Sequence, residues 1–271
     1  MSMKEYFNIL KYGIRNIYNK KIKSYGFIAN DGIAKKSLSD FVNNIPTDTV
    51  VAFVGLKQIK YYAGIENPAE YMIELFQRKF KNIIVPTFTP SVKRTKNFDI
   101  KNTSSESGAF SNAFLKVADY RTPSPFKSFA IKGPIISEIE QLQFDNDYAS
   151  NGIFEFINKN KIPSVNLGTS DIRPICIHYA EYSKNVPYAK VEKEKIRIIY
   201  KDGNIDTKNI SAFSYKMNYK VNRDKIEKDL IQNSLNKEQI VNGICMRYIP
   251  EDGYFPFFLE RISKDPYYLV K

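Results

Sequence analysis

The chain has 271 residues, of which 43% are hydrophobic, a composition typical of a globular protein with a sizeable core. No apolar run reaches about eighteen residues, which excludes a membrane-spanning helix, and Lys4, Lys11 and Arg15 interrupt the first segment, so we expect no secretory signal. The net charge of +12 favours anionic partners: a phosphorylated cofactor, a nucleotide-linked substrate, nucleic acid or an acidic membrane face. Because Lys, Asn and Ile are all plentiful, part of this charge also fits compositional bias without function.

Cysteine and histidine usage argues against disulfides and metal sites. Cys176 and Cys245 lie far apart in the sequence and fit neither a disulfide framework nor a metal motif. With only one histidine, the chain also offers too few good ligands for zinc. We therefore expect two reduced core thiols, a cytoplasmic protein and no metal.

Residues 1–26 are predicted to form an amphipathic helix. Its apolar stripe consists of Met3, Tyr6, Phe7, Leu10, Ile14, Ile17 and Tyr18. Lys and Arg occupy the other face, so the helix suits either packing on the core, which we favour, or peripheral contact with a membrane surface.

The next elements alternate between helices and strands. We expect a short helix over 37–45 beginning at Ser37 or Ser39, and a buried strand over 50–54. A helix over 67–80 follows, with Asn67 as its cap and Pro68 at its first position. A second buried strand covers 82–88. This order predicts a right-handed crossover and a parallel strand pair in an α/β fold.

The middle of the chain continues the alternation after a polar interruption. Residues 93–108 are rich in Lys, Asn and Ser and are predicted to form a long loop of functional interest. The elements expected after it are a helix over 107–117, a strand over 127–133, a helix over 150–160 and a strand over 162–168.

The last third has a different pattern. We expect a hairpin over 195–205 with Asp202-Gly203 in its turn, a helix over 222–235 and a strand over 240–249. Neither a repeat nor a linker separates the parts. The chain is therefore predicted to be one domain over 1–271, with a core over 27–190 and a smaller C-terminal α+β elaboration over 191–271.

The stretch DIRPICIHYAEY, residues 171–182, holds the only histidine. If it is helical, with Pro174 near its start and Asp171 as its cap, His178 and Glu181 share one face. Imidazole accepts a proton near neutral pH, and a nearby carboxylate raises its basicity, which is the arrangement of a general base with its orienting acid. Because the helix follows a predicted parallel strand, we expect its start at the carboxyl edge of the sheet. The spacing alone favours a structural histidine, since such short motifs predict function poorly.

A series of stretches in order changes that balance: DTVVAFVGL, NIIVPTFTPS, SESGAFSNAF, YRTPSPFKSFAIKG, NLGTSDIRPICIHYAEY and VPY. Over roughly 32–188, this series resembles the aminoglycoside 3-N-acetyltransferase family. In that family a Leu-Gly strand leads into a Leu-His-x-Ala-Glu helix, which here is Ile177-His178-Tyr179-Ala180-Glu181.

The resemblance implies an acyl-CoA-dependent N-acyltransferase with a three-layer α/β/α sandwich and a largely parallel central sheet. Acetyl-CoA or another acyl-CoA would be the donor. His178, supported by Glu181, would deprotonate the acceptor amine, which would attack the thioester directly. The residues that match the family's cofactor segments are Thr87, Thr89, Arg121 and Ser128.

Two segments depart from the family pattern. The first strand usually ends in His-Ser-Ser-Leu, whereas this chain has Phe53-Val54-Gly55-Leu56. Ser124 stands where the Arg-Ser-x-His-Pro-x-x-Ser-like segment carries its histidine. CoA is therefore held differently, or the donor differs, or cofactor binding is lost; retention of the only histidine argues against the loss.

Charge bears on the acceptor. The middle loop carries the cations Lys93, Arg94, Lys96 and Lys101, with Asp99 as the one acid between them. Such a loop suits phosphates better than a polycationic aminoglycoside. The sequence therefore favours a nucleotide- or lipid-linked amino sugar of surface-polysaccharide biosynthesis, with antibiotic modification second.

Alternatives to this acceptor and to this activity stay open. Glu106, Asp145 and Asp147 offer local acidity for binding an acceptor amine. A non-catalytic ligand-binding protein is consistent with the altered segment, and basic charge with 14% aromatic residues suits a nucleic-acid binder. Since no nucleic-acid module is recognisable, we expect no nucleic acid as partner.

Overall fold

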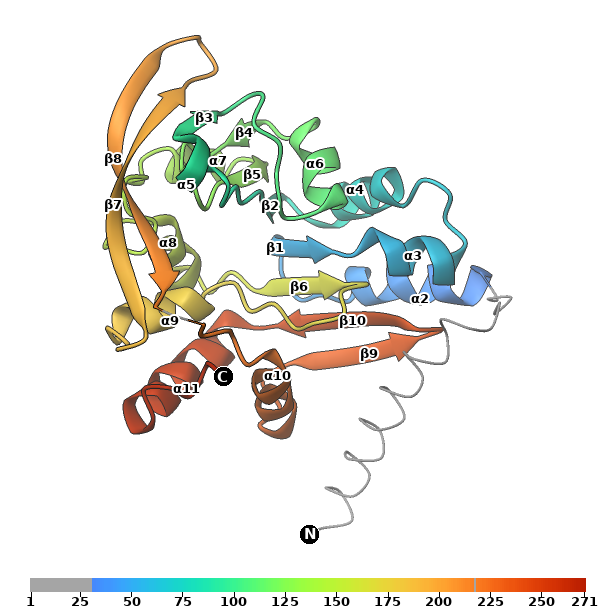
Figure 1. The fold of residues 1–271 in the computed structure, drawn as a ribbon. Coiled ribbons are helices and arrows are strands. Elements are labelled where there is room, and N and C mark those ends of the chain that lie inside the picture. Colours follow the sequence, from blue (N-terminus) through green and yellow to red (C-terminus); the bar gives the residue numbers. More distant parts are fainter. Residues whose placement is uncertain (1–30, 217) are drawn as a thin grey trace. The chain divides into compact units, whose positions relative to one another are not determined.

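The computed structural model describes residues 31–216 and 218–271 (Figure 1). The predicted helix over 1–26, with its membrane contact, lies outside these residues. Within the described ranges, no helix combines the length and the apolar content needed to cross a bilayer. In the same ranges, no three His, Cys, Asp or Glu side chains converge as a metal site requires.

A seven-stranded mixed sheet forms the centre, in the order β4-β5-β2-β1-β6-β10-β9 (Figure 1). Its strands are β1 (Thr49–Val54), β2 (Asn82–Pro86), β4 (Tyr120–Arg121), β5 (Phe129–Lys132), β6 (Ser164–Leu167), β9 (Lys237–Val241) and β10 (Ile244–Ile249). β1 pairs in parallel with β2 and β6, as predicted from the strand–helix–strand order. The outer strands all pair antiparallel, so the sheet is parallel only in its centre.

Helices cover both faces of this sheet, and the predicted three-layer α/β/α sandwich is confirmed. One face packs against α2 (Asp31–Asn43), α3 (Leu56–Ala63), α4 (Pro68–Lys79) and α6 (Ala109–Leu115). The other packs against α7 (Ile136–Ile139), α8 (Ile153–Lys159), α9 (Ile177–Ser183), α10 (Arg223–Gln232) and α11 (Glu251–Lys264). Strand alternation builds the layers: Val50 and Ala52 point to the first face and Val51 to the second.

A second, three-stranded sheet stands apart from the first in the order β3-β7-β8. The predicted hairpin is confirmed and is longer than expected, with β7 (Ala189–Ile199) and β8 (Ile205–Tyr215) joined through Gly203 at φ +87°. The predicted loop over 93–108 is partly wrong, because α5 (Val92–Thr95) and β3 (Asn97–Asp99) occupy its first half. This sheet has a small core of its own, made of Val92, Phe98, Ile100, Phe126, Ile196, Ile198, Ile210 and Ala212.

Several predicted boundaries are wrong. α2 already includes Asp31, the first described residue, so the helix extends ahead of the expected start at Ser37 or Ser39. The single strand expected over 240–249 is a hairpin, because Asn242 and Gly243 both take positive φ values and form a tight turn between β9 and β10.

The C-terminal part contributes to the central layers. β10 pairs with β6, and α10 and α11 pack on the sheet beside α9. The division into a core over 27–190 and an elaboration over 191–271 stays a prediction.

Candidate functional site

The segment between β6 and α9 turns back along the strand that it has just left. Arg173 N donates to Asn166 Oδ1 at 2.6 Å, and Ile175 N donates to Ser164 Oγ at 3.2 Å. Because Ser164 is the first residue of β6, α9 begins near the amino end of that strand. The expectation of a helix start at the carboxyl edge is therefore wrong: polar side chains of the strand itself bind the returning backbone.

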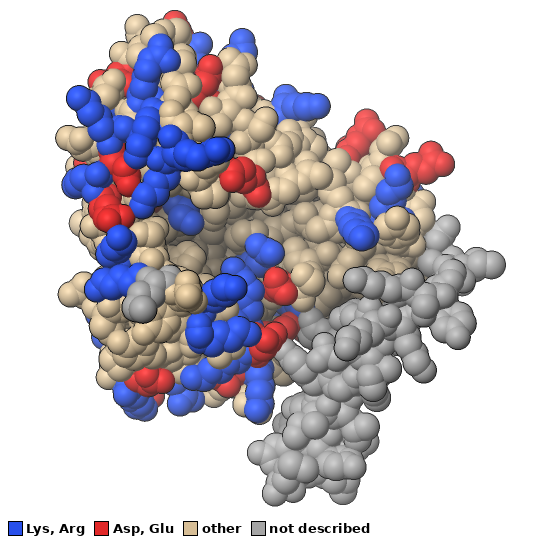
Figure 2. Space-filling model, in the orientation of Figure 1, with Lys and Arg blue, Asp and Glu red and all other residues tan. Residues whose placement is uncertain are grey.

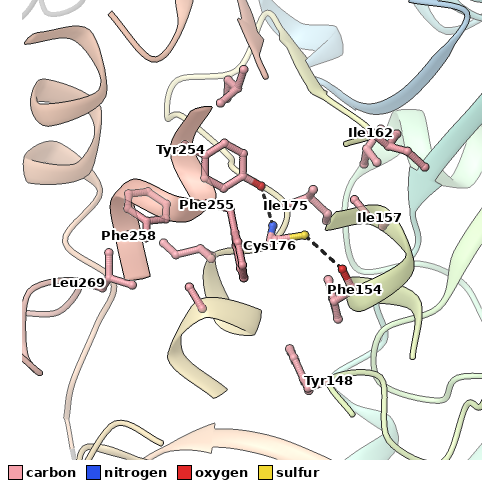
Figure 3. Packing of buried hydrophobic residues seen from close by; sticks show 14 of the residues in the cluster. Tyr148, Phe154, Ile157, Ile162, Ile175, Cys176, Tyr254, Phe255, Phe258 and Leu269 are labelled. Atoms are coloured by element: carbon pink, nitrogen blue, oxygen red, sulfur yellow. Dashed lines mark hydrogen bonds between the residues drawn. The ribbon is translucent and has the colours of Figure 1, made fainter. Parts of the chain in front are cut away.

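The start of α9 is anchored in the hydrophobic core rather than capped by Asp171, which lies six residues before Ile177. Cys176 N donates to Tyr254 Oη at 2.9 Å, and Cys176 Sγ lies 3.6 Å from Phe154 O (Figure 3). The cysteine is fully buried. These contacts fix the backbone two residues before the histidine.

A second anchor holds the loop that precedes α9. Arg247 on β10 is fully buried and contacts carboxylates of α10 and β9 at 2.6 and 2.8 Å. It also donates from Nη1 to Thr169 O at 3.1 Å. The C-terminal elements therefore position the chain that leads to the histidine.

His178 and Glu181 form the predicted pair, with 2.7 Å between Nδ1 and Oε2. The Glu181 side chain is fully buried, whereas that of His178 is 25% exposed. Glu181 Oε1 also accepts hydrogen bonds from Tyr188 Oη and Tyr215 Oη, both at 2.8 Å. The carboxylate is thus held by the imidazole and two phenols, which compensates its burial.

This arrangement fixes the state of the imidazole. A carboxylate only accepts hydrogen bonds, so Nδ1 carries the proton in neutral His178 and Nε2 carries the lone pair. Burial, followed by the Glu181 charge, raises the pKa values of Tyr188 and Tyr215, so both phenols stay protonated donors. The rings of Phe213 and Tyr215 lie 5.6 and 5.8 Å from the imidazole and restrict its rotation. The site therefore presents an oriented base to solvent.

Three predicted cofactor residues form one buried polar cluster. Thr87 Oγ1 lies 3.0 Å from Ser128 Oγ, and Arg121 Nε donates to the same oxygen at 3.2 Å. Arg121 also donates to Thr87 O at 3.2 Å and to two carbonyls of the 100–103 turn. Burial lowers the pKa of Arg121 to about 10, so it remains a cation. Thr89, also buried, donates to the Pro125 carbonyl.

These four residues are buried and have a structural role. They hold together the segment after β2, the segment before β5 and the 100–103 turn. Each is at most 3% exposed. Their direct contact with a cofactor stays a prediction.

The three carboxylates expected near the acceptor have separate partners. Glu106 Oε1 accepts from Ser91 N at 2.9 Å on the surface, and Asp145 is exposed. Asp147 is buried and accepts from Ser124 Oγ at 2.7 Å. Burial raises the pKa of Asp147 to about 7, against the opposing effects of the Ser124 hydrogen bond and the Lys127 charge. Their role in acceptor binding stays a prediction.

The structure adds site residues that the sequence reasoning missed. Tyr215 and Phe213 come from β8, beyond the stretch in which the family resemblance was recognised. Lys127 was also missed: its Nζ lies 4.5 Å from the centroid of the Phe88 ring, and the Asp147 and Glu181 carboxylates act on its charge. In the sequence, the only sign of a role for Lys127 was a charged residue directly before Ser128.

The altered segment at the end of β1 has a packing explanation. A Cβ on Gly55 would lie 2.1 Å from Gly168 O, closer than any side chain allows. Gly168 itself has φ +65°, and its N donates to Cys245 O at 2.7 Å. The ends of β1 and β6 therefore meet backbone to backbone, which requires glycine at position 55.

Comparison with known proteins identifies the family. A family model described as aminoglycoside 3-N-acetyltransferase matches residues 56–255. The chain belongs to the aminoglycoside 3-N-acetyltransferase family. The predictions of this family, of an acyltransferase and of acetyl-CoA as donor are confirmed at the level of the family. No curated protein matches the chain in sequence.

Solved structures agree with this aminoglycoside 3-N-acetyltransferase fold. AAC-IIIb, in a binary complex with CoASH, superposes with a TM-score of 0.70 at 10% identity, over 85% of this chain and 96% of its own. The YokD protein from Bacillus subtilis gives 0.70 at 16% identity, over 91% and 98%. Sisomicin-bound AAC-VIa gives 0.66 at 14% identity, over 86% and 97%. At these identities the likeness concerns the fold alone.

Proposed function

We propose that this chain transfers an acetyl group from acetyl-CoA to an amine of an amino sugar, with His178 as general base. Aminoglycosides are the acceptors that the family favours, and two relatives of the same fold were captured with CoASH and with sisomicin. The observation that carries the proposal is the His178–Glu181 pair, whose carboxylate is fully buried while its imidazole reaches solvent.

The reaction needs one proton carrier. Acetyl-CoA supplies the activated acetyl group as a thioester. His178 Nε2 takes a proton from the amine while the amine nitrogen bonds to the thioester carbonyl carbon. The imidazolium returns that proton to the sulfur as the carbon–sulfur bond breaks, so an amide and a free thiol result.

Glu181 acts through the histidine. Its carboxylate holds Nδ1–H and stabilises the imidazolium that forms when Nε2 is protonated. Tyr188 and Tyr215 keep the carboxylate in place, because each donates a hydrogen bond to it. Without these two donors, the buried carboxylate would have fewer hydrogen bonds to compensate its burial and to hold it against the imidazole.

A second acceptor class is an amino sugar that carries an anionic group, such as a nucleotide- or lipid-linked sugar of surface-polysaccharide biosynthesis. The net charge of +12 favours this anionic acceptor class, because it attracts phosphate. Lys127, on whose charge the Glu181 carboxylate acts, favours the class for the same reason. Polycationic aminoglycosides gain nothing from either feature.

The test is release of free thiol from acetyl-CoA in the presence of aminoglycosides and simpler amino sugars, with the acetylated product verified by mass spectrometry. His178→Ala should lower kcat roughly 100- to 10,000-fold, the usual contribution of a general base. Ser183→Ala is the matched control, since Ser183 is exposed on the same helix and its hydroxyl donates to the Tyr179 carbonyl. Full activity of the His178 variant, or no thiol release with any amine, refutes the proposal.

A further inference from the structure

Lys127 has a backbone that is fixed on both sides. Its N donates to Ser124 Oγ at 3.3 Å, and the next residue, Ser128, belongs to the buried cluster with Thr87 and Arg121. The side chain is partly buried, and its Nζ lies over the Phe88 ring, 4.5 Å from the centroid. An ammonium held by its backbone and by an aromatic face is an ordered charge rather than a mobile surface lysine.

This charge belongs to the same site as the His178–Glu181 pair. Burial lowers the pKa of Lys127, and the carboxylates of Asp147 and Glu181 both oppose that effect, so both lie within electrostatic reach. Asp147 is followed by Tyr148, whose ring lies 5.2 Å from Phe213, which in turn lies 5.6 Å from His178. These contacts join Asp147, which lies within electrostatic reach of Lys127, to His178 through two aromatic rings.

Neither carboxylate forms an ion pair with this lysine. In the described part of the chain, no carboxylate oxygen lies within 4.0 Å of Lys127 Nζ. Glu181 is committed to His178 and two tyrosines, and Asp147 Oδ2 to Ser124. The N–H donors of the Lys127 ammonium are therefore available to hydrogen-bond a group that binds at the site.

Part of the molecular surface carries charge of the same sign as this lysine. Figure 2 shows Lys and Arg side chains gathered over the β7–β8 hairpin and again over the lower part of this face, with the surface hollowed between them. Glu192 and Glu194 of the hairpin form ion pairs with Lys190 and with Lys93 and Lys96 beside it, so the local excess of positive charge is smaller than the colouring suggests. A polycation gains little attraction from such a face, whereas an anion is drawn toward it.

We propose that Lys127 determines acceptor specificity by binding a phosphate or carboxylate of the amino sugar whose amine reaches His178. The acceptors that react best are then amino sugars with an anionic group, and polycationic aminoglycosides react less well. This inference rests on the proposed acetyl transfer at the same site, and it names the substrate class within it. Ordinary ammonium–phosphate hydrogen bonds supply the recognition, since charge-assisted bonds are the stronger kind.

The test uses a matched acceptor pair, glucosamine 6-phosphate and glucosamine, which differ only in the phosphate, with sisomicin as the polycation. In Lys127→Met, kcat/KM for the phosphorylated sugar should fall roughly 10- to 100-fold through KM, as expected for one lost charge-assisted bond. In the same variant, kcat/KM for glucosamine should stay within about threefold of the natural protein's value, and kcat/KM for sisomicin should rise. Lys127→Arg should keep the preference, because it keeps the charge and donors. Lys116→Met, which removes an exposed lysine and the same net charge, should change none of the ratios.

Binding measured without turnover separates this inference from the acetyl-transfer proposal. Titration of each protein with glucosamine 6-phosphate in the presence of CoA should show binding to the natural protein and not to Lys127→Met. If that difference appears but no amine is acetylated, Lys127 binds the anion and the proposed reaction is wrong. If acetylation occurs and the Lys127→Met ratios equal those of the natural protein, the reaction stands and the role of Lys127 is refuted. Absence of both binding and turnover refutes both.

Discussion

Glu251, the first residue of α11, is predicted to make the protein less stable as the pH rises through the weakly acidic range. The side chain is fully buried, and neither carboxyl oxygen has a hydrogen-bond partner among the described residues. Burial raises its pKa from 4.5 to about 7, while the neighbouring Tyr254 and Cys176 groups lower it. The folded protein therefore keeps a proton on Glu251 that the unfolded chain has lost between these two pH values.

The sign and size of the effect follow from linkage. Because the unfolded state binds fewer protons than the folded state in this window, the free energy of unfolding falls as the pH rises, and it levels off above about 7. A difference of about 2.5 pKa units, at 1.36 kcal/mol each, corresponds to about 3 kcal/mol. Glu251→Gln cannot ionise and should escape this loss.

The assay is urea unfolding at about pH 5 and about pH 8. Relative to the natural protein, Glu251→Gln should gain about 2.5 kcal/mol of stability between the two conditions, because part of the effect is already present at about pH 5. Other titrating groups, Asp147 included, are present in both proteins and cancel in the comparison. Glu260→Gln, an exposed change on the same helix, should show no such gain. An equal difference between Glu251→Gln and the natural protein at both pH values would refute the reasoning.

Two further substitutions test the site and its scaffold. Tyr215→Phe removes hydrogen bonds of 2.8 and 3.0 Å to Glu181, so kcat should fall roughly tenfold at unchanged KM. An unaltered kcat would show that Tyr215 does not support the pair. Gly55→Ala places a Cβ 2.1 Å from the Gly168 carbonyl and should cost more than about 2 kcal/mol in thermal or urea unfolding, whereas Gly203→Ala, with open space around it, should lose less.

The helix–strand pattern of the core was predictable because strand alternation and short linking helices are local properties of the sequence. One element that was missed, α11, is a segment in which local signals conflict with packing. α11 contains Gly253 and Pro256, which normally argue against a helix, yet Tyr254, Phe255 and Phe258 bury enough apolar surface to hold it. Local propensity was overridden by tertiary contacts.

The His178–Glu181 pair was predictable for a different reason, since both members lie on one helical turn. Their support was not, because Tyr215 comes from a strand in the second sheet, more than thirty residues later in the chain. Likewise, the return of 168–176 along β6 depends on Ser164 and Asn166 side chains that a sequence pattern treats as ordinary strand residues. Contacts between distant segments carry no periodic signal.

The two departures from the family pattern have different physical causes, and this bears on what the enzyme acetylates. At Gly55 the cause is backbone packing, which constrains the scaffold and says nothing about charge. At Ser124 the hydroxyl binds the buried Asp147 and also accepts the backbone N–H of Lys127, so this departure is tied to the placement of a cation. If Lys127 binds an anionic group as proposed, a site that keeps its base and holds an ordered ammonium differs in its preference among acceptors rather than in its chemistry. Acceptor charge is therefore the property in which this chain should differ most from aminoglycoside-acetylating members of its family.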